Sequence, residues 1–383
     1  MSIQSNPIKC CGCLACESSC DFGAIKMSTD AHGFVYPKVD SSLCTECHKC
    51  EKICAFTNDD QNRNSIKRAY AFALHDRKAL RESTSGGAFT AISNLVLSNG
   101  GLVAGSVLDA DLSVHHILTD DFERRDQMRK SKYVQSDTEG IFKEVSAALE
   151  NGRMVLFVGT PCQCGQMIRY AGKNTANLIT CDFLCHGVPS HSFFKGHIAY
   201  LEKLFGEKVI QYAFRDKEFG WSHTEGVQFA SGKWNYSKRV QSYRKFFYDN
   251  VTLRPSCLSC PYRSAERCAD LTIADYWGVN KQLKDNKFPH DNRGVSLIMV
   301  SSDKGLKIAE QLDRYGTVYD VQREDIQFKF SSTVTKVTLD EKQFWETFDR
   351  LGYEGLVKKY ISYSWKKEII FTLKNWGRKL LRG

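Results

Sequence analysis

The stretch CCGCLACESSC at residues 10–20 returns at residues 44–54 as CTECHKCEKIC. In both stretches four cysteines follow the spacing C-x2-C-x2-C-x3-C, and each of these four in the first stretch has a counterpart 34 residues later. A structural zinc site uses four ligands, usually as two separated C-x2-C pairs, and does not explain eight cysteines repeated in register. A disulfide framework is typical of small secreted chains. The repeat therefore predicts thiolates that hold metal clusters.

This spacing is typical of bacterial two-cluster ferredoxins, in which the fourth cysteine of each run ligates the cluster of the other run. We therefore predict two 4Fe–4S clusters in an N-terminal module. Their ligand sets are Cys10, Cys13, Cys16 and Cys54 for one cluster, and Cys44, Cys47, Cys50 and Cys20 for the other. Asp21 and Ala55 replace the proline that usually follows the fourth cysteine, which changes the local turn rather than the ligands. Cys11, beside a ligand, is predicted to be a packed free thiol.

Length and cysteine content limit the class of protein. A chain of 383 residues predicts two or three domains. Sixteen cysteines, most of them explained as metal ligands, favour a reducing cytoplasm. Residues 1–9 lack the apolar core of a signal peptide, and no apolar run approaches the roughly 18 residues that a membrane-spanning helix needs.

The net charge of +9 is concentrated at the C-terminus. From Lys358 to Gly383 only Glu368 is acidic, so this segment carries +7 and the rest of the chain is close to neutral. A general nucleic-acid-binding surface is therefore disfavoured, and we expect no nucleic-acid partner. The eight basic residues of the segment are Lys358, Lys359, Lys366, Lys367, Lys374, Arg378, Lys379 and Arg382.

The same C-terminal segment has an amphipathic pattern. Its apolar residues recur at three- and four-residue intervals and so share one face of a helix. They are Ile361, Trp365, Ile369, Leu373, Trp376 and Leu380. A basic amphipathic helix with tryptophans predicts a peripheral contact of residues 361–383 with an anionic membrane, on its inner face. The alternative is a helix that packs its apolar face on the protein's own core or on a second subunit of an oligomer.

Beyond the N-terminal module and a polar linker at residues 57–67, strand-like and helix-like segments alternate. The pattern predicts an α/β fold, α+β overall: a ferredoxin-like dicluster module, then a mixed sheet flanked by helices, then a helical tail. Chemistry is expected on loops at strand ends. The predicted strands cover residues 69–74, 102–108, 154–158, 178–184 and 295–300, and the predicted helices 88–98, 141–150, 193–205 and 304–315, with one more ending at residue 170. The predicted domains are 1–57, 68–175, 176–330 and the tail at 340–383.

A second group of cysteines lies outside the N-terminal module. Cys257 and Cys260 form a C-x2-C pair flanked by prolines, while Cys162 and Cys185 occupy two predicted strand-end loops. Such a pair alone is compatible with zinc, a cluster or a redox dithiol. Beside a module that already holds cubanes, a third 4Fe–4S cluster is favoured over zinc and over buried unligated thiols.

Two further loops carry small or polar residues. The STSGG loop at residues 83–87 would let backbone N–H groups approach a phosphate at a helix N-terminus, although ordinary strand-to-helix turns look similar. The SKYVQS segment at residues 131–136 offers many donors and one cation, which suits a pyrophosphate or a flavin edge, or an exposed polar segment. No G-x-G-x-x-G dinucleotide fingerprint is present, so a direct nicotinamide partner lacks support.

Together these motifs resemble the coenzyme F-420 hydrogenase/dehydrogenase beta-subunit family, and especially its bacterial branch with a fused N-terminal dicluster ferredoxin. The resemblance runs from about residue 8 to about residue 320. The motifs that carry it are STSGG (83–87), SKYVQS (131–136), VGTPCQ (158–163), FLCHGVPS (183–190), CLSCPYR (257–263) and ADLTIADYWG (269–278).

The resemblance implies a flavoprotein, with FAD or FMN next to an iron–sulfur cluster. It implies a flavin-proximal 4Fe–4S cluster on Cys162, Cys185, Cys257 and Cys260, with Cys268 as a substitute for Cys162 or Cys185. The implied cofactor contacts are Ser85, Gly86, Gly87, Lys132, Gly159 and Thr160. His186 and Lys132 are the candidate catalytic residues; His186 would donate a proton near the flavin, or else make a structural hydrogen bond.

The function predicted on this basis is an oxidoreductase. Electrons would enter from a redox donor such as a ferredoxin or a reductase subunit, pass through the clusters, and be paired on the flavin for an organic acceptor. With the tail on a membrane, the setting suggested by the resemblance is a lipid-linked intermediate of envelope polysaccharide assembly. The alternatives are a non-catalytic, ferredoxin-like electron-transfer subunit and a structural zinc protein. The sequence does not identify the donor or the acceptor, and bacterial relatives need not use the deazaflavin coenzyme.

Overall fold

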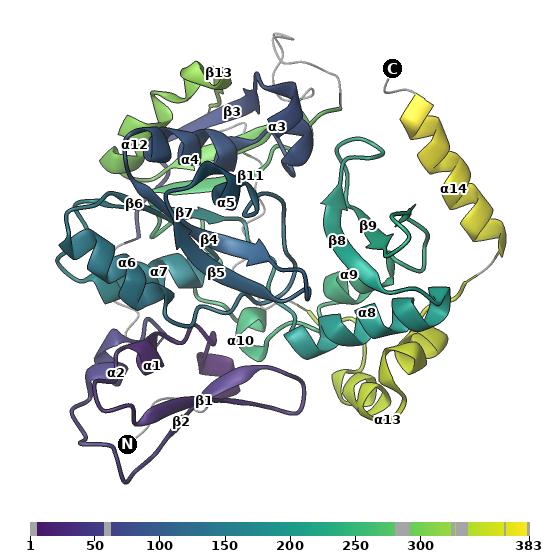
Figure 1. Cartoon of the computed structure of the whole chain (residues 1–383), viewed down its shortest axis with the longest axis horizontal. Coiled ribbons are helices and arrows are strands. Elements are labelled where there is room, and N and C mark those ends of the chain that lie inside the picture. Colours follow the sequence, from purple (N-terminus) through teal and green to yellow (C-terminus); the bar gives the residue numbers. More distant parts are fainter. Residues whose placement is uncertain are drawn as a thin grey trace.

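The computed structural model describes residues 6–56, 63–279, 292–322, 326, 336–363 and 365–380. Most of the predicted linker at 57–67 therefore lies outside the described residues. The main body contains an eight-stranded mixed sheet in the order β13-β3-β12-β11-β7-β6-β4-β5 (Figure 1). The strands are β3 (Arg68–Leu74), β4 (Leu102–Leu108), β5 (Val114–Thr119), β6 (Val155–Val158), β7 (Leu178–Phe183), β11 (Leu271–Asp275), β12 (Ser296–Val300) and β13 (Gly316–Asp320).

The direction of the strands changes across this sheet. The central strands β11, β7, β6 and β4 are parallel, whereas β5 at one edge and β12, β3 and β13 at the other pair antiparallel. This confirms the mixed α/β sheet predicted from the alternation of segments. Strands from both sides of residue 175 take part, so the two predicted α/β domains share one sheet.

Helices cover both faces of the sheet, and the strand sequences show why. Along β3, Phe72 and Leu74 face one hydrophobic core while Ala71 and Ala73 face another, as the two-residue period of a strand requires. The first core is completed by α3 (Arg77–Glu82), α4 (Ala88–Ser98) and α12 (Asp303–Ala309). On the other face, α6 (Ile141–Glu150) and α7 (Pro161–Ala171) pack over β4, β6 and β7.

Most of the predicted elements are confirmed to within a few residues. The helix predicted at 304–315 is shorter, because α12 ends at Ala309 and a 3-10 turn (η2, Leu312–Arg314) follows. The chain must reverse there, since Tyr315 O accepts a hydrogen bond from His75 N at 3.0 Å and Gly316 begins the edge strand β13.

A second, smaller sheet lies beside the main body (Figure 1). It is antiparallel and packs with its helices around an aromatic core that includes Phe193, Phe194, Tyr243, Phe246 and Phe344. Its elements are α8 (His191–Phe205), β8 (Val209–Asp216), β9 (Thr224–Phe229), β10 (Trp234–Asn235), α9 (Ser242–Tyr248) and α13 (Glu341–Tyr360), and α14 (Trp365–Leu380) follows.

The N-terminal module is the smallest part and packs against the main body below α6 and α7 in Figure 1. Its β1 and β2 pair antiparallel, from Ile25↔Val39 to Thr29↔Val35. Its elements are η1 (Pro7–Lys9), α1 (Ala15–Ser18), β1 (Ile25–Thr29), β2 (Val35–Val39) and α2 (Lys49–Ile53).

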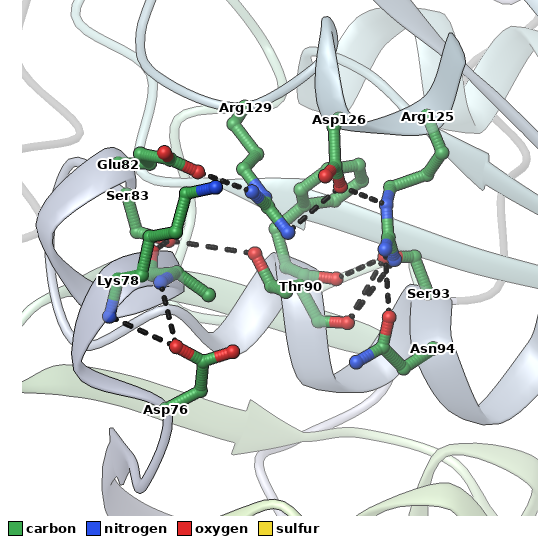
Figure 2. Close-up of polar contacts among 12 residues, drawn as sticks. Asp76, Lys78, Glu82, Ser83, Thr90, Ser93, Asn94, Arg125, Asp126 and Arg129 are labelled. Atoms are coloured by element: carbon green, nitrogen blue, oxygen red, sulfur yellow. Dashed lines mark hydrogen bonds and ion pairs between the residues drawn. The ribbon is translucent and has the colours of Figure 1, made fainter. Parts of the chain in front are cut away.

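A buried arginine joins α5 (Phe122–Asp126) to α4. Figure 2 shows the Arg125 guanidinium directed at Asp126, Asn94 and the neighbouring polar groups of α4. The Nε–Asp126 Oδ1 distance is 3.0 Å and the Nη2–Asn94 Oδ1 distance is 2.7 Å. Since a buried charge is costly without partners, this set of acceptors explains how Arg125 is tolerated there.

The smaller sheet contains a buried acid. Glu225 on β9 is 0% exposed and accepts hydrogen bonds from the Tyr212 hydroxyl at 3.0 Å and from Arg244 N at 3.2 Å. Removal from water is the main cause that raises the pKa of Glu225 to about 8, against a smaller opposing effect of Arg244. The folded protein therefore keeps a proton at neutral pH that the unfolded chain releases.

We expect Glu225 to make the folded state less stable as pH rises. Folding favours the protonated form of Glu225. The contribution of this proton to the stability of the folded state is complete below the pKa of an unfolded glutamate, and it is lost as pH rises through about 8. The free energy of unfolding should fall by up to about 1.4 kcal/mol per pH unit from this one site. Urea unfolding between pH 6 and pH 8 would measure it, and Glu225→Gln should remove this part of the slope. The exposed Glu144→Gln is the control, and equal slopes for Glu225→Gln and wild type would contradict the expectation.

Candidate functional site: three sets of thiols

The two cysteine runs of the module fold into equivalent loops. Gly12 and Glu46, 34 residues apart, both have positive φ (63° and 55°), and so do Leu14 and His48 (59° and 56°). A non-glycine residue in this region is strained and persists where its surroundings determine the conformation. In each run the second of these residues is the N-cap of the short helix that follows, α1 or α2. The sequence repeat is therefore a repeat of backbone shape.

The first thiol set brings Cys54 to the run that begins at Cys10. The thiols of Cys13, Cys10 and Cys54 neighbour the Cys16 thiol. Those of Cys13 and Cys54 also neighbour the Cys10 thiol. Burial is the main cause that raises the pKa of the Cys10 and Cys16 thiols, while the Gly12 and Glu17 amides point at their sulfurs and oppose it. These four cysteines are the ligand set predicted for one cluster.

The second set lies at the outer end of the module. Cys20, Cys44, Cys47 and Cys50 line one open hollow, together with apolar residues of β1 and β2. Cys20 comes from the other run, as the crossed ligation predicts. The rim is more exposed than the first set, because Cys47 is exposed and Glu46, His48 and Lys49 surround it.

The third set is in the main body, where the parallel strands end. Cys162 opens α7 after β6, and Cys185 follows β7, the neighbour of β6. Cys257 in α10 (Pro255–Leu258) and Cys260 complete the set. The thiols of Cys257, Cys162 and Cys260 all neighbour the Cys185 thiol. Burial raises the pKa of Cys257 to about 11 and that of Cys260 to about 12. The two segments are held together by the Arg254 N to Val188 O bond of 2.9 Å and the Arg263 Nη2 to His186 O bond of 3.0 Å.

Two further cysteines differ in their surroundings. Cys268 contacts the Pro161 carbonyl at 3.7 Å, and its charged neighbours are Asp182 and Arg267 rather than the third set. The thiols of Cys13 and Cys162 both neighbour the Cys11 thiol and are the main causes that raise its pKa. Cys11 therefore connects the first thiol set to the third, a position that the prediction of a packed free thiol did not foresee.

The thiol sets suit clusters better than single ions. Among the described residues, no three His, Cys, Asp or Glu side chains converge as ligands of one metal ion would. A cubane needs a wider arrangement, because each cysteine binds a different iron atom. Buried thiols with raised pKa values are costly to ionise, and bound iron supplies the positive charge that stabilises the thiolates. The residues present therefore fit iron–sulfur clusters.

Side chains of the main body hold the backbone of the first cysteine loop. Four successive carbonyls, from Cys10 to Cys13, each accept a hydrogen bond from them. The bonds are Arg254 Nε to Cys10 O at 2.7 Å, Gln135 Nε2 to Cys11 O at 3.1 Å and to Gly12 O at 3.0 Å, and Thr138 Oγ1 to Cys13 O at 2.8 Å. A methyl group on Gly12 would lie 2.6 Å from Arg254 Nη1, so this position needs glycine for space as well as for its φ. Gln135, predicted within a donor-rich flavin segment, thus supports the cysteine loop.

Helix α7 holds the second half of the module. Gln166 uses both ends of its amide: Oε1 accepts from Ala55 N at 2.9 Å, and Nε2 donates to Ile53 O at 2.6 Å. Arg169 Nε donates to Lys52 O at 2.8 Å, and the Tyr170 hydroxyl donates to Ser18 O at 3.2 Å. The helix that begins with Cys162 of the third set therefore also positions the loop of Cys54.

The loops predicted to contact a flavin come together at one end of the sheet. Ser131 N donates to Thr84 Oγ1 at 2.9 Å, which joins the segment of Lys132 to the loop of Ser85, Gly86 and Gly87. A methyl group on Gly86 would lie 2.0 Å from Phe72 O, so close packing on β3 alone requires this glycine. Gly159 and Thr160 lie between β6 and α7, where Thr160 caps the helix and its hydroxyl is 3.1 Å from the Cys162 sulfur.

The two candidate catalytic residues have structural partners. The Lys132 ammonium donates to the carbonyls of Gln127, Met128 and Arg129 at 3.2, 2.8 and 2.9 Å. Burial is the main cause that lowers the pKa of Lys132 to about 7, and Lys130 adds to it. His186 Nε2 lies 2.7 Å from Asn250 Oδ1, and burial lowers the His186 pKa. The structure thus shows the structural hydrogen bond that was the alternative interpretation of His186.

An aromatic group near His186 was not found from the sequence. Trp221 and Trp277 stack at 4.1 Å between ring centroids, and His223 stacks on Trp277 at 5.2 Å. Tyr248 packs against the rings of both His223 and His186. These residues come from the β8–β9 loop, the end of α9 and the segment after β11, and they carry no shared motif, so only the fold brings them together.

One family model matches part of the chain. Residues 152–325 match the family described as the C terminus of the beta subunit in coenzyme F420 hydrogenase/dehydrogenase. The match confirms the resemblance to that family over residues 152–325 and relates this part of the chain to subunits of oxidoreductases. The matched residues include Cys162, Cys185, Cys257 and Cys260, the whole third set.

A solved structure gives a weaker similarity. The chain aligns with one from the F420-reducing NiFe hydrogenase complex of Methanosarcina barkeri, studied as a xenon derivative, with 16% identity and a TM-score of 0.48. The alignment covers 77% of this chain and 90% of that chain. No curated protein matches the sequence.

We expect Gln166→Leu to loosen the N-terminal module. The leucine keeps most of the side-chain volume but leaves Ala55 N and Ile53 O without partners, which costs about 1–3 kcal/mol for each buried group. Loss of visible absorbance during anaerobic urea unfolding should therefore begin at lower urea than in wild type. The control is Gln228→Leu on β9, far from the module in the chain. Equal midpoints for the two variants would show that Gln166 does not hold the module.

Proposed function

We propose that the chain is an iron–sulfur flavoprotein oxidoreductase that passes electrons from a ferredoxin-type donor to an organic acceptor. The observation that carries this proposal is the succession of three four-cysteine sets, with the first and third joined through Cys11. Cys10, Cys13, Cys16 and Cys54 would hold one 4Fe–4S cluster, Cys20, Cys44, Cys47 and Cys50 a second, and Cys162, Cys185, Cys257 and Cys260 a third. Bound clusters and flavin supply, respectively, one-electron carriers and the conversion to a two-electron reduction.

The exposure and packing of the three thiol sets would determine the direction in which electrons pass through them. Cys47 of the outer set is exposed, so this set is open to the approach of a donor such as a ferredoxin or a reductase subunit. The hydrogen bonds of Gln135, Thr138 and Gln166 to the module keep the first set at a constant distance from the third. The third set lies at the carboxyl ends of β6 and β7, which is the usual place for a cofactor in such a sheet.

The flavin, FAD or FMN, is placed in this proposal at the same end of the sheet. Its support is that Ser131 and Thr84 join the segment of Lys132 to the loop of Ser85–Gly87, and that the Gly159–Thr160 loop lies beside Cys162 of the third set. Thr160 contacts Cys162 directly, so a change at the third set should also disturb a flavin bound by this loop. A non-catalytic electron-transfer subunit, the alternative function, would hold the clusters without flavin.

Anaerobic purification with assay of iron, sulfide and flavin tests the proposal. Three cubanes predict about twelve irons per chain, with one flavin. Cys185→Ser should remove about four irons and weaken flavin retention, because the two cofactors would share a wall. Cys164→Ser is the matched control, since this buried thiol lies outside the three sets and should leave both contents unchanged.

The outcomes separate the candidate functions. Irons without flavin would favour the electron-transfer subunit. A colourless preparation that contains zinc would exclude the proposal, and an unchanged iron content in Cys185→Ser would exclude this ligand set.

We also propose that the chain is cytoplasmic and contacts the inner face of a membrane through its C-terminal segment. In the described part of the chain, no helix has both the length and the apolar character needed to cross a bilayer. Helix α14, however, leaves Ile369 and Leu373 of the predicted apolar face 50% and 60% exposed, and Ile370 is exposed beside them. Its described contacts with the protein are made by Glu368, which accepts from Lys238 N at 3.0 Å, and by Phe371 under Lys238. This arrangement supports an apolar face turned outward, toward a lipid surface or a second copy. A lipid-linked acceptor of polysaccharide assembly is the finer proposal that follows.

Co-sedimentation with anionic liposomes over a salt series tests the membrane contact. The full chain should bind at low salt and release at high salt, because each basic residue near the surface contributes about 1 kcal/mol. Ile369→Ser with Leu373→Ser should bind much less. Ile210→Ser, at an exposed apolar residue of β8, is the matched control and should bind like wild type. Unchanged binding of the double variant would contradict the membrane contact. So would a wild-type dimer that forms without liposomes and is lost in the double variant.

A further inference from the structure

Arg254 is a buried cation between the first and third thiol sets. It is 0% exposed, and its side chain points toward the module while its carbonyl accepts from Cys257 N at 2.8 Å. The guanidinium donates to Cys10 O at 2.7 Å, to Val35 O at 2.8 Å and to Gln135 Oε1 at 3.0 Å. Nη2 also lies 3.7 Å from the Cys10 sulfur. The guanidinium therefore contacts a ligand of the predicted first cluster directly.

The charge of Arg254 lacks the partner that other buried arginines have. Arg125 pairs with Asp126 at 3.0 Å, Arg267 pairs with Asp182 at 2.8 Å, and Arg215 pairs with Asp275. Around Arg254, no carboxylate of the described residues lies within ion-pair distance, and its polar contacts are neutral oxygens and the Cys10 sulfur. The rings of Tyr36 and Phe34, 4.4 and 5.5 Å from the guanidinium carbon, contribute only weak cation–π attraction. A buried unpaired charge is expensive, so a negative group is expected beside it.

The first thiol set supplies that negative group when it holds a cluster. Four cysteine thiolates outweigh the positive charge of the iron–sulfide core, so the cluster is an anion, and one-electron reduction makes it more negative. Net charge and hydrogen bonds to the sulfurs are the main determinants of a cluster's potential. A cation in contact with a ligand sulfur favours the reduced form over the oxidised form.

We propose that Arg254 is a positioning residue that raises the reduction potential of the cluster held by Cys10, Cys13, Cys16 and Cys54. The inference rests on the proposed function for the existence of this cluster and adds the group that controls it. The described charged residues that line the outer set, on Cys20, Cys44, Cys47 and Cys50, are exposed or half-buried, and the nearby Lys49–Asp21 pair at 2.8 Å is exposed. Water and salt screen such charges, and Arg254 does not contact that set. The outer cluster is therefore an internal reference in the same molecule.

The test is a redox titration of the full, cluster-loaded chain with dithionite, followed by electron paramagnetic resonance. The signals of the two module clusters are assigned first with Cys47→Ser, which alters the outer one. Arg254→Gln removes the charge and keeps hydrogen-bonding groups, and Arg254→Lys keeps the charge. In Arg254→Gln the first cluster should become at least tenfold harder to reduce, a downward shift of about 59 mV or more for one electron. Arg254→Lys should stay closer to wild type, and the outer cluster should not move in either variant. Arg125→Gln, at a buried arginine on α5, is the matched control and should move neither cluster.

Each outcome decides the proposal. An unchanged first-cluster potential in Arg254→Gln would overturn it, and so would an equal shift of both module clusters, which would indicate a general change of structure. If Arg254→Gln fails to retain the first cluster while Arg254→Lys retains it, the requirement for charge is supported. If both variants lose that cluster alike, the residue acts only through packing and the proposal fails. Absence of iron from wild-type protein would instead refute the proposed function, and the role of Arg254 with it.

Discussion

The arrangement of this protein depends on one interface, in which the main body binds the backbone carbonyls of the first cysteine loop. Carbonyls in a buried loop need donors, and Arg254, Gln135 and Thr138 provide them for four successive residues. The loop cannot move without losing several of these bonds together. The interface thus joins the N-terminal module and the main body into one unit, in which the positions of the thiol sets relative to one another are fixed.

The same interface explains how a small module can keep eight thiols together. A chain segment of about 50 residues buries little apolar surface, so packing against a larger neighbour, together with the proposed clusters, has to supply much of its stability. Gln166 on α7 adds contacts to the second half of the module, and Tyr170 adds one to the first half. Because α7 also begins with Cys162, the helix that stabilises the module is the helix that positions the third set.

Sequence reasoning succeeded where a local pattern determines the structure. The cysteine spacing predicted the loops that the φ angles of Gly12 and Glu46 now show as equivalent, and the alternation of apolar segments predicted the strands and helices of the mixed sheet. It did not find Arg254, Gln135 or the stacked Trp221 and Trp277, because their roles arise from contacts across more than 50 residues of chain. Gly86 shows a different limit of sequence reasoning. A glycine that is needed for close packing on a neighbouring strand cannot be distinguished in the sequence from one that lets the backbone approach a phosphate.

The two halves of the cysteine repeat have equivalent backbone shapes, but they do not accept the same residues at equivalent positions. Position 12 must be glycine because Arg254 and Gln135 fill the space where a side chain would begin, whereas Glu46, with the same backbone conformation, has its side chain in solvent. The outer loop could therefore accept the residue of the inner loop, but the inner loop could not accept that of the outer. Two segments with one sequence pattern are thus restrained unequally: the outer copy has space for a side chain at this position, and the inner copy is restricted by residues outside the repeat.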